Sequence, residues 1–481
     1  MRYSRPCLTL ALCLCWLGAA ATPTSETEWM ALMLEGQKTG WLKSVRTVHE
    51  DRVEHEETVH IALRRSGVAI ELTTVDRTVE TREGRPLSFS SVQEIAGGSM
   101  RVEGEVDTEG NATVRTISGG SEQTQEFTWP AGALLPEGLR LATLAHGLEP
   151  GTTFTTSAFI ASSLQAADVE VRVVGPERVD LFGVEMDLTR TEQVMDLGTT
   201  TTTVVGWVDE DLSAKKMEFS IMGMTLETIA CPEDCALAEA QPAEFFTQAF
   251  ASAPRSLSER MLDDGLEYIL RPTGEIAIHF PTGSEQAAQA LDDGTFRVRV
   301  DPGTTRRPAT IPEASPYLGQ TRWLQSQAPE VMALLAQAGG VTDDPVETMH
   351  RLEAFVRDYV SDKNLSVGYA TALETARSRS GDCTEHALLL AALGRSAGIP
   401  TRVATGLAYV ENWLGARNVF VPHAWTQALI DGRWVSFDAA LYGFDAGHLA
   451  LSFGDGDPWN FYDGVNTLGN FEIVSIEALP E

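Results

Sequence analysis

The sequence predicts a multidomain protein, with an N-terminal all-β antiparallel domain followed by an α+β domain. At 481 residues the chain is too long for one ordinary hydrophobic core. Apolar and polar residues alternate from about Trp29 to Leu226, broken by glycines, as is typical of half-buried strands joined by turns. After a proline-rich stretch, the spacing of apolar residues changes from two to about 3.6, which indicates helices.

The first 21 residues have the features of a secretory signal peptide. Arg2 and Arg5 precede an apolar run from Leu8 to Leu17, and the small residues 18–21 follow it. This order of basic, apolar and small segments is typical of a cleaved signal. We therefore expect a periplasmic or secreted protein with no membrane insertion after cleavage. An uncleaved N-terminal anchor is the alternative.

The composition is strongly acidic, with a formal net charge of −32. Nucleic acids and anionic membrane surfaces would repel such a chain. We therefore expect no nucleic-acid partner, and the simplest role of the charge is solubility.

Residues 22–235 are predicted to form the all-β antiparallel domain, as a curved sheet or an open barrel that returns on itself. Strand-favouring runs occur at residues 68–72, 89–95, 169–174 and 199–205. The first hairpin is expected at Trp29–Trp41. His49, His55 and His60 lie in a polar strand region, where we expect solvated surface positions rather than a metal site.

Three of the six cysteines lie in the predicted signal peptide, which leaves Cys231, Cys235 and Cys383. Three residues including a proline separate the first two, so a turn can bring their thiols together. We expect a local disulfide between them. A redox-active pair and a metal half-site are alternatives, but the usual redox spacing is two residues and further soft ligands are not apparent. Cys383 is then the odd thiol.

Residues 236–309 are predicted to be a linker with a short β segment. A short helix is expected at Ala243–Phe250, because Pro242 is tolerated at a first turn. Candidate strands follow at residues 265–270, 276–280 and 296–300. The proline-rich stretch from Pro302 to Pro316 then leads into the second domain.

The second domain, residues 310–481, contains clear helix signals. Asp344 can cap a helix that begins at Pro345, where no amide is lost. Its apolar side consists of Met349, Leu352, Val356 and Val360. Another helix is expected at Ala370–Arg377, and it leads into the turn before Cys383.

Cys383 lies where a tight polar turn meets an apolar helix. Gly381 permits the turn, and Asp382 can cap the helix. The amides and dipole of a first helical turn favour a thiolate and can supply an oxyanion site. For an isolated cysteine, a buried structural role is the alternative.

Residues 421–438 predict a β-hairpin around an Asp-Gly turn. If Ile430 pairs with Arg433, counting back places Trp425 opposite Asp438. A shift of one residue in this register would move Asp438 to the other face of the sheet.

This register makes His423 the diagonal neighbour of Asp438, because His423 shares a face with Trp425. The carboxylate can then orient one imidazole nitrogen while the other faces Cys383. A base-assisted nucleophile requires this arrangement.

These segments together resemble the core of the transglutaminase-like superfamily. The resemblance covers roughly residues 310–445. It rests on Gly381-Asp382-Cys383, Arg395 to Arg402, His423-Ala424-Trp425, and Gly432-Arg433-Trp434 through Phe437-Asp438. It implies a papain-like α+β fold with Cys383 as nucleophile, His423 as general base and acid, and Asp438 as the orienting residue. It does not explain the β region.

The expected function is cysteine-dependent acyl transfer or hydrolysis on a peptide bond or a glutamine carboxamide, through a thioester. The expected partner is a protein or peptide substrate, with no cofactor and no metal. One alternative is a non-catalytic binding or scaffolding protein of the cell envelope with an idle triad. Another is a zinc site in which Cys383 and His386 join His423 and Asp438.

Overall fold

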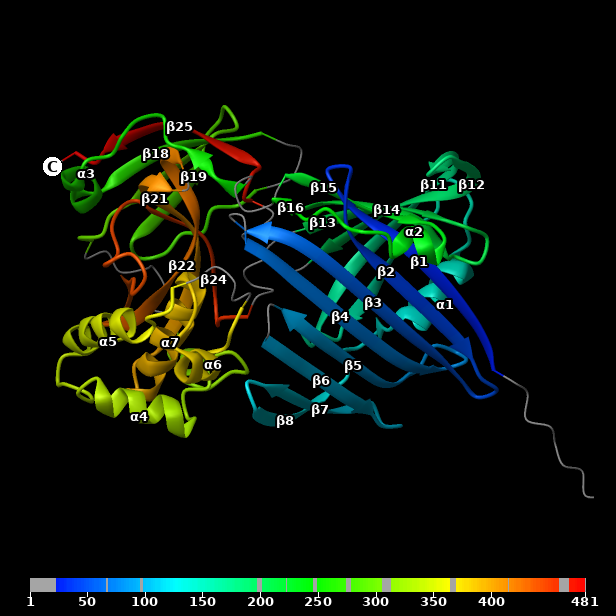
Figure 1. Cartoon of the computed structure of the whole chain (residues 1–481), viewed down its shortest axis with the longest axis horizontal. Coiled ribbons are helices and arrows are strands. Elements are labelled where there is room, and N and C mark those ends of the chain that lie inside the picture. Colours follow the sequence, from blue (N-terminus) through cyan, green and yellow to red (C-terminus); the bar gives the residue numbers. More distant parts are fainter. Residues whose placement is uncertain are drawn as a thin grey trace, which may run out of the picture.

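The computed structural model describes residues 23–65, 68–95, 98–196, 201–221, 223–244, 249–273, 278–304, 313–363, 369–413, 415–457 and 467–480. The predicted signal peptide at residues 1–21 lies outside these ranges. Within them, a large β region is followed by a C-terminal region of helices and sheets, and the two lie side by side (Figure 1). The predicted fold class is therefore confirmed.

The N-terminal region is built around one large sheet. Its strands are β1 (Thr24–Leu34), β2 (Gln37–Val48), β3 (Arg52–Arg65), β4 (Val68–Thr81), β5 (Pro86–Ile95), β6 (Gly98–Val106), β7 (Asn111–Ser118), β8 (Ser121–Thr128), β9 (Ala133–Leu134), β10 (Thr153–Ile160), β11 (Gln165–Leu181), β12 (Val184–Asp196), β13 (Thr201–Val208), β14 (Ala214–Ile221) and β15 (Met224–Ala230). The spatial order runs from β8 down to β1, then from β15 down to β9. Neighbours on this path are antiparallel except for the two-residue β9, which runs parallel to β10.

This sheet is strongly curved and returns on itself (Figure 1). Phe89 and Val102 from β5 and β6 pack in one buried cluster with Ala133 and Phe159 from β9 and β10, so its two halves meet through side chains. Helix α1 (Pro136–His146) belongs to this region, and its first two amides donate to the Glu80 carboxylate of β4.

A cavity of about 630 Å³ lies within the β region and is lined mainly by polar side chains. His55 lines this cavity, and its Nε2 lies 3.3 Å from Glu137 Oε2. The expectation that His55 is a solvated surface residue is therefore wrong. The sheet curvature turns one face of β3 inward, which alternation alone does not indicate.

The remaining elements belong to the C-terminal region or connect to it. They are α2 (Glu233–Ala236), β16 (Ala243–Glu244), β17 (Ala251–Ser252), α3 (Glu259–Asp264), β18 (Leu266–Pro272), β19 (Gln286–Ala290), β20 (Phe296–Val300), the 3₁₀ helix η2 (Ser315–Tyr317), α4 (Pro329–Gln337), α5 (Pro345–Tyr359), α6 (Ala372–Ser378), α7 (Cys383–Ser396), β21 (Thr401–Trp413), β22 (Ala416–Ile430), β23 (Arg433–Phe437), β24 (His448–Gly454) and β25 (Phe471–Ala478). Asp344 caps α5 as predicted, because its side chain accepts from the Val346 amide.

The C-terminal region is layered around the sheet β17-β22-β21-β24, to which β23 adds beside β22. Helix α7 packs on this sheet and contacts α4, α5 and α6 in one apolar core. Elsewhere Leu407, Phe420 and Leu449 pack on a second sheet, β19-β20-β18-β25. Since β18 pairs with β25, the short β segment predicted before the helices is joined to the end of the chain.

Two local expectations between the regions are wrong. Residues 243–244 form β16 rather than a helix, and residues 245–248 lie outside the described ranges. The pairing of β2 with β3 stops at Ile61, so the next residues of β3 offer a vacant edge that β16 takes. Cys231 and Cys235 are free cysteines rather than a disulfide, although their side chains hydrogen-bond.

The predicted strands have a mixed outcome. Residues 266–272 and 296–300 form β18 and β20, as expected. Residues 278–280 are not in a strand, and residues 276–277 of that prediction lie outside the described ranges.

The β region packs against the helices that precede Cys383. Arg377 of α6 donates to the carbonyl of Gly119, in the turn between β7 and β8, and Arg322 donates to the carbonyl of Ser162 at 2.8 Å. Met100 of β6 is buried in the helical core. The two regions therefore share an interface beside the helical layer.

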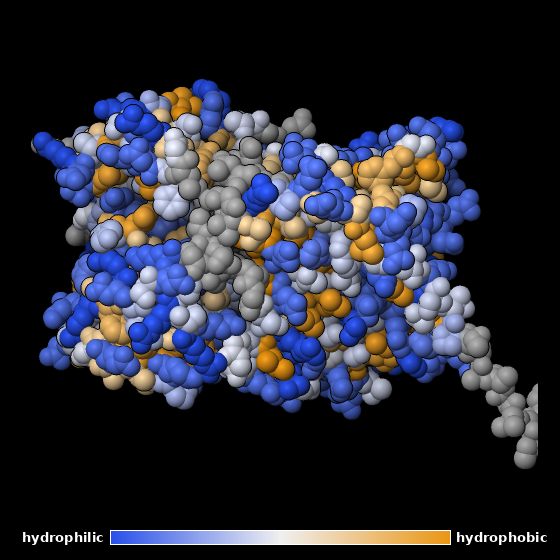
Figure 2. Space-filling model, viewed as in Figure 1, coloured by the Kyte–Doolittle hydropathy of each residue, from blue (hydrophilic) through white to orange (hydrophobic). Residues whose placement is uncertain are grey.

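No helix in the described ranges has the length and hydrophobicity of a membrane span. Figure 2 shows a largely hydrophilic face, on which apolar side chains form only small scattered groups.

Candidate active site

Cys383 is the first residue of α7 and is half-buried. The Asp382 carboxylate caps the helix by accepting from the Thr384 amide at 3.0 Å, and Glu385 accepts from the Asp382 amide at 2.8 Å. The predicted cap is therefore confirmed. Gly381 has a φ of +153°, and a Cβ there would lie 2.3 Å from Glu385 Cβ, so the turn requires glycine.

The cap also limits the chemistry of the first turn. The Asp382 side chain engages the amides of Thr384 and Glu385, which are therefore not open to an oxyanion. Burial, and then the charge of Asp382, raise the pKa of Glu385 to about 8. Near neutral pH Glu385 therefore largely keeps a proton, and Asp382 is the main negative charge beside Cys383.

The hairpin that carries the other two predicted residues has the expected register. Ile430 pairs with Arg433, and the ladder continues to Thr426 opposite Phe437. Strand β23 ends there, so Asp438 follows directly after the strand. The prediction that His423 and Asp438 share a face is therefore confirmed.

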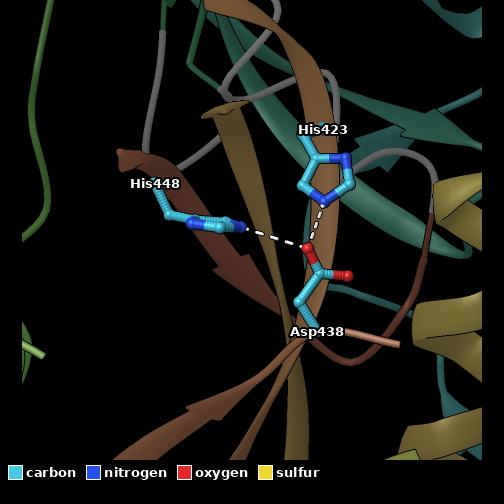
Figure 3. A group of neighbouring side chains, drawn as sticks. All are labelled: His423, Asp438 and His448. Carbon is cyan, nitrogen blue, oxygen red and sulfur yellow. Dashed lines mark hydrogen bonds and ion pairs between the residues drawn. The ribbon is translucent and has the colours of Figure 1, made fainter. Parts of the chain in front are cut away.

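His423 and Asp438 form a buried hydrogen bond, with 2.8 Å between His423 Nε2 and Asp438 Oδ2. The second ring nitrogen of His423, Nδ1, points away from Asp438 (Figure 3). The carboxylate therefore fixes the ring and leaves Nδ1 for another partner.

Helix α7 lies against the strand that carries His423. Thr426 Oγ1 donates to the carbonyl of Ala387, one turn after Cys383, at 2.9 Å. The charge of Asp438 also acts on His386, in the first turn of α7. The structure thus brings the start of α7 near the His423–Asp438 pair, and contact between the Cys383 thiol and His423 Nδ1 stays a prediction.

Asp438 is surrounded by hydrogen-bond donors. Its Oδ1 accepts from the amides of Ala440 and Leu441 at 2.7 and 3.2 Å. Burial works against the charged form, but His423 and His448 outweigh it and hold the pKa of Asp438 well below its usual range. The amide of Asp438 also donates to Glu353 of α5 at 2.7 Å, which fixes the backbone.

His448 is a residue of this site that the sequence analysis did not identify. It begins β24, and its Nε2 lies 3.1 Å from Asp438 Oδ2, the same oxygen that His423 contacts (Figure 3). Its Nδ1 lies 3.0 Å from Asp445 Oδ1. Burial opposes its charge, but Asp438 and Asp445 outweigh burial and raise the pKa of His448 to about 9. The only signal in the sequence is a lone histidine opening an apolar strand.

Gly406 allows β24 to come this close. It lies opposite His423 on β21, and the pairing of β21 with β24 shifts register beside it. A Cβ at Gly406 would lie 2.1 Å from the carbonyl oxygen of Leu449, next to His448. The glycine therefore helps to set the position of His448.

The structure does not support the zinc set proposed from the sequence. His386 Nδ1 lies 2.5 Å from the carbonyl of Asp382. Among the described residues, the side chains close enough to share an ion are His423, Asp438 and His448, with candidate atoms within 4.8 Å of one another. Hydrogen bonds already account for their spacing, because each imidazole reaches the carboxylate at 3.1 Å or less.

Comparisons with known proteins find a family match for part of the chain. Residues 333–439 match the transglutaminase-like superfamily. No curated protein matches the chain.

Three solved structures show partial similarity. A candidate cysteine protease from Cytophaga hutchinsonii has 17% identity and a TM-score of 0.28 over 46% of this chain and 84% of its own. A β-barrel-like protein of unknown function from Brucella abortus has 12% identity and a TM-score of 0.32 over 43% of this chain and 94% of its own. A candidate protease from Parabacteroides distasonis has 9% identity and a TM-score of 0.17 over 73% of this chain and 68% of its own. These scores are too low to establish a shared fold.

The matched residues run from α4 through α7 and the β22–β23 hairpin to just past Asp438. They include Cys383, His423 and Asp438, in the chain order on which the sequence resemblance rested. The resemblance is confirmed: the chain carries, at residues 333–439, a domain of the transglutaminase-like superfamily.

Proposed function

We propose that this protein is a cysteine-dependent acyl-transfer enzyme that acts on a peptide bond or a glutamine carboxamide. Cys383 is the nucleophile, His423 the general base and acid, and Asp438 the residue that orients His423. The observation that carries the proposal is the buried bond between His423 Nε2 and Asp438 Oδ2, beside the helix that Cys383 begins.

The reaction proceeds through a thioester. His423 Nδ1 takes the thiol proton, and the Cys383 sulfur forms a bond to the carbonyl carbon. The carbon–nitrogen bond then breaks, and His423 returns the proton to the leaving amine. Water or a second amine attacks the thioester, gives a proton to His423, and releases the thiolate. Hydrolysis and amine transfer therefore use the same residues.

The direct test is replacement of the nucleophile. Cys383→Ala should abolish capture of an acyl group from a peptide or glutamine substrate, while the melting temperature stays close to that of the native protein. Mass spectrometry of the intact protein would detect the acyl-enzyme. A Cys383→Ala protein that still turns over such a substrate would end the proposal.

Alkylation distinguishes an active site from an idle triad in a scaffolding protein. An activated Cys383 should react with iodoacetamide well below about pH 8, where an ordinary thiol is mostly protonated. Cys231 is an internal control, because burial and then its hydrogen bond to Cys235 raise its pKa to about 12. If Cys383 is alkylated only above about pH 8, the idle-scaffold alternative is favoured.

We also propose that the protein is exported and meets its protein or peptide substrate in the periplasm or outside the cell. The support is the basic, apolar and small-residue order of residues 1–21. N-terminal sequencing of the mature protein tests this, since cleavage should fall just after residue 21. An uncleaved terminus on a membrane-bound protein would favour the anchor instead.

A further inference from the structure

His448 is a buried histidine with no step of its own in the proposed reaction. Only 3% of it is exposed, and it lies at the start of β24 between two carboxylates. Figure 3 shows its ring directed at the same carboxylate oxygen as the ring of His423. A buried charge-bearing group at a reaction centre needs an explanation.

The partners of His448 determine its protonation. Nε2 lies 3.1 Å from Asp438 Oδ2, while Nδ1 lies 3.0 Å from Asp445 Oδ1 and 3.2 Å from the Asp445 carbonyl. Ionised carboxylates and carbonyls accept hydrogen bonds but do not donate them. The Asp445 amide also donates toward Nδ1, which alone would favour an unprotonated Nδ1, but this contact is the longest of the three, at 3.3 Å. The shorter contacts with oxygen atoms favour hydrogen on both ring nitrogens, and with it the imidazolium form of His448.

His423 differs from His448 although the two rings share one oxygen. Among the described residues, only its Nε2 contacts a carboxylate, and Nδ1 points away from Asp438. The ring centroids of the two histidines are 5.6 Å apart. Asp438 thus hydrogen-bonds two rings that differ in state. The His448 ring is already cationic, whereas the His423 ring can still accept a proton on Nδ1.

We propose that His448 is a positioning residue that keeps a fixed positive charge behind Asp438 and so holds His423 in the form that accepts a proton from Cys383. This inference rests on the function proposed above. A second positive charge on His423 is opposed by His448, so His423 gives up its extra proton more readily. The same effect makes protonated His423 a stronger acid toward the leaving amine.

The other charges around His448 do not cancel this effect. Asp438 and Asp445 bind it directly, and Glu285, ahead of β19, interacts with it electrostatically. Burial raises the pKa of Glu285 to about 7, so Glu285 is largely neutral below that pH. His386 of α7 interacts with Asp438, but burial lowers its pKa. His448 is thus the charged imidazole of the group in acidic solution.

The expected size of the shift in the pH profile follows from the distance between the His423 and His448 rings. Two unit charges separated by about this distance, at an effective dielectric constant of roughly 20, change a titration midpoint by about two pH units.

The test compares the pH profile of Cys383 alkylation by iodoacetamide in the native protein and in His448→Gln. Glutamine keeps an N–H donor for Asp438 but carries no charge. The pH at which alkylation reaches half its plateau on the acid side should rise by about two pH units in His448→Gln, because a nearby cation no longer promotes loss of the first proton. His60→Gln, which removes a histidine of the β region, should leave the profile unchanged.

The outcomes separate this inference from the proposed function. If native Cys383 reacts like an ordinary thiol, the proposed function fails, and this inference fails with it. If native Cys383 is activated but the folded His448→Gln protein has the same profile, only the role of His448 is overturned.

A second measurement needs no variant to fold. Nitrogen NMR of the native protein, labelled at histidine, should show one ring protonated on both nitrogens from acidic pH up to about pH 8. A His448 ring that is neutral at pH 7 would overturn the inference. So would a stoichiometric metal ion in the purified native protein that perturbs the His448 ring nitrogens, since the cluster would then be a metal site.

Discussion

Asp438 in the C-terminal region and Glu57 in the β region are carboxylates with opposite surroundings, because Asp438 is buried whereas Glu57 is exposed along a cavity. Asp438 accepts from two imidazoles and two backbone amides, and these donors hold its pKa well below the usual range despite burial. Glu57 lies directly opposite Asp76 on the neighbouring strand and lines the cavity. Burial, and then the charge of Asp76, raise the pKa of Glu57 to about 7.

The cations that line the cavity are engaged elsewhere. Arg46, Arg140 and His55 all bind Glu137, and together they hold the pKa of Glu137 well below its usual range against the cost of burial. Within the described part of the chain, neither Glu57 nor Asp76 has an ion pair, and burial raises the pKa of Asp76 although Ser91 acts against this. The comparison teaches that an acid contributes to stability or weakens it according to the donors and charges that surround it.

Removal of the Asp438 charge should have the largest effect. In Asp438→Asn, the side chain that accepts hydrogen bonds from two imidazoles becomes an amide that also donates. The charge on His448 then loses one of its two carboxylate partners. We expect a loss of about 3–5 kcal/mol in the free energy of unfolding and a fall of about 10³-fold or more in acyl-enzyme formation. Urea denaturation and single-turnover acylation would measure the two effects.

Asp431→Asn is a matched control for this change. Asp431 lies in the hairpin turn with a φ of +50°, a conformation that asparagine tolerates. This variant should be close to the native protein in both measurements. A loss of less than about 1 kcal/mol in Asp438→Asn would contradict the view that this carboxylate anchors a charged network.

Gly406→Ala tests the same network without changing a charge. The added Cβ meets the Leu449 carbonyl and should push β24, and with it His448, away from Asp438. Overpacking of this kind costs about 1–3 kcal/mol, and thermal unfolding would show it. Gly319→Ala is the control, because no atom lies within 4 Å of a Cβ at that position. Equal stability of the two variants would show that β24 adjusts freely.

The sequence was sufficient for the parts of this site that depend on local rules. The Asp-Gly turn set the hairpin register, and that register placed His423 beside Asp438. The role of Asp382 as the N-cap of α7 followed from the residue preferences of helix caps. Strand alternation likewise indicated the large β region.

Long-range packing explains what the sequence analysis missed. His448 reaches Asp438 because β24 pairs with β21, and no local pattern specifies that pairing. The pairing of β18 with β25 is also long-range, because the two strands lie about 200 residues apart in the sequence. The pairing of Glu57 with Asp76 follows from the β3–β4 register, but their shared exposure to a cavity depends on the curvature of the whole sheet.

Glu57→Gln should have the smallest effect, and of the opposite sign. An acid whose folded-state pKa is raised costs stability once it ionises in the unfolded chain. The penalty is therefore absent below about pH 4.5, grows between about pH 4.5 and 7, and is complete above about pH 7. Water in the cavity screens the charge, so we expect Glu57→Gln to gain only about 1 kcal/mol at pH 8 and nothing at pH 4.

Denaturation curves at pH 4 and pH 8 would check this sign, with Glu56→Gln as the control. Glu56 is the preceding residue on β3 and pairs with Arg77, so its replacement should give no gain at either pH. If repulsion by Asp76 contributes to the penalty, Asp76→Asn should shrink the gain from Glu57→Gln at pH 8. A gain that is the same at both pH values would mean that the added stability is not electrostatic. The contrast between a penalised charge on Glu57 and a stabilised charge on Asp438 would then be wrong.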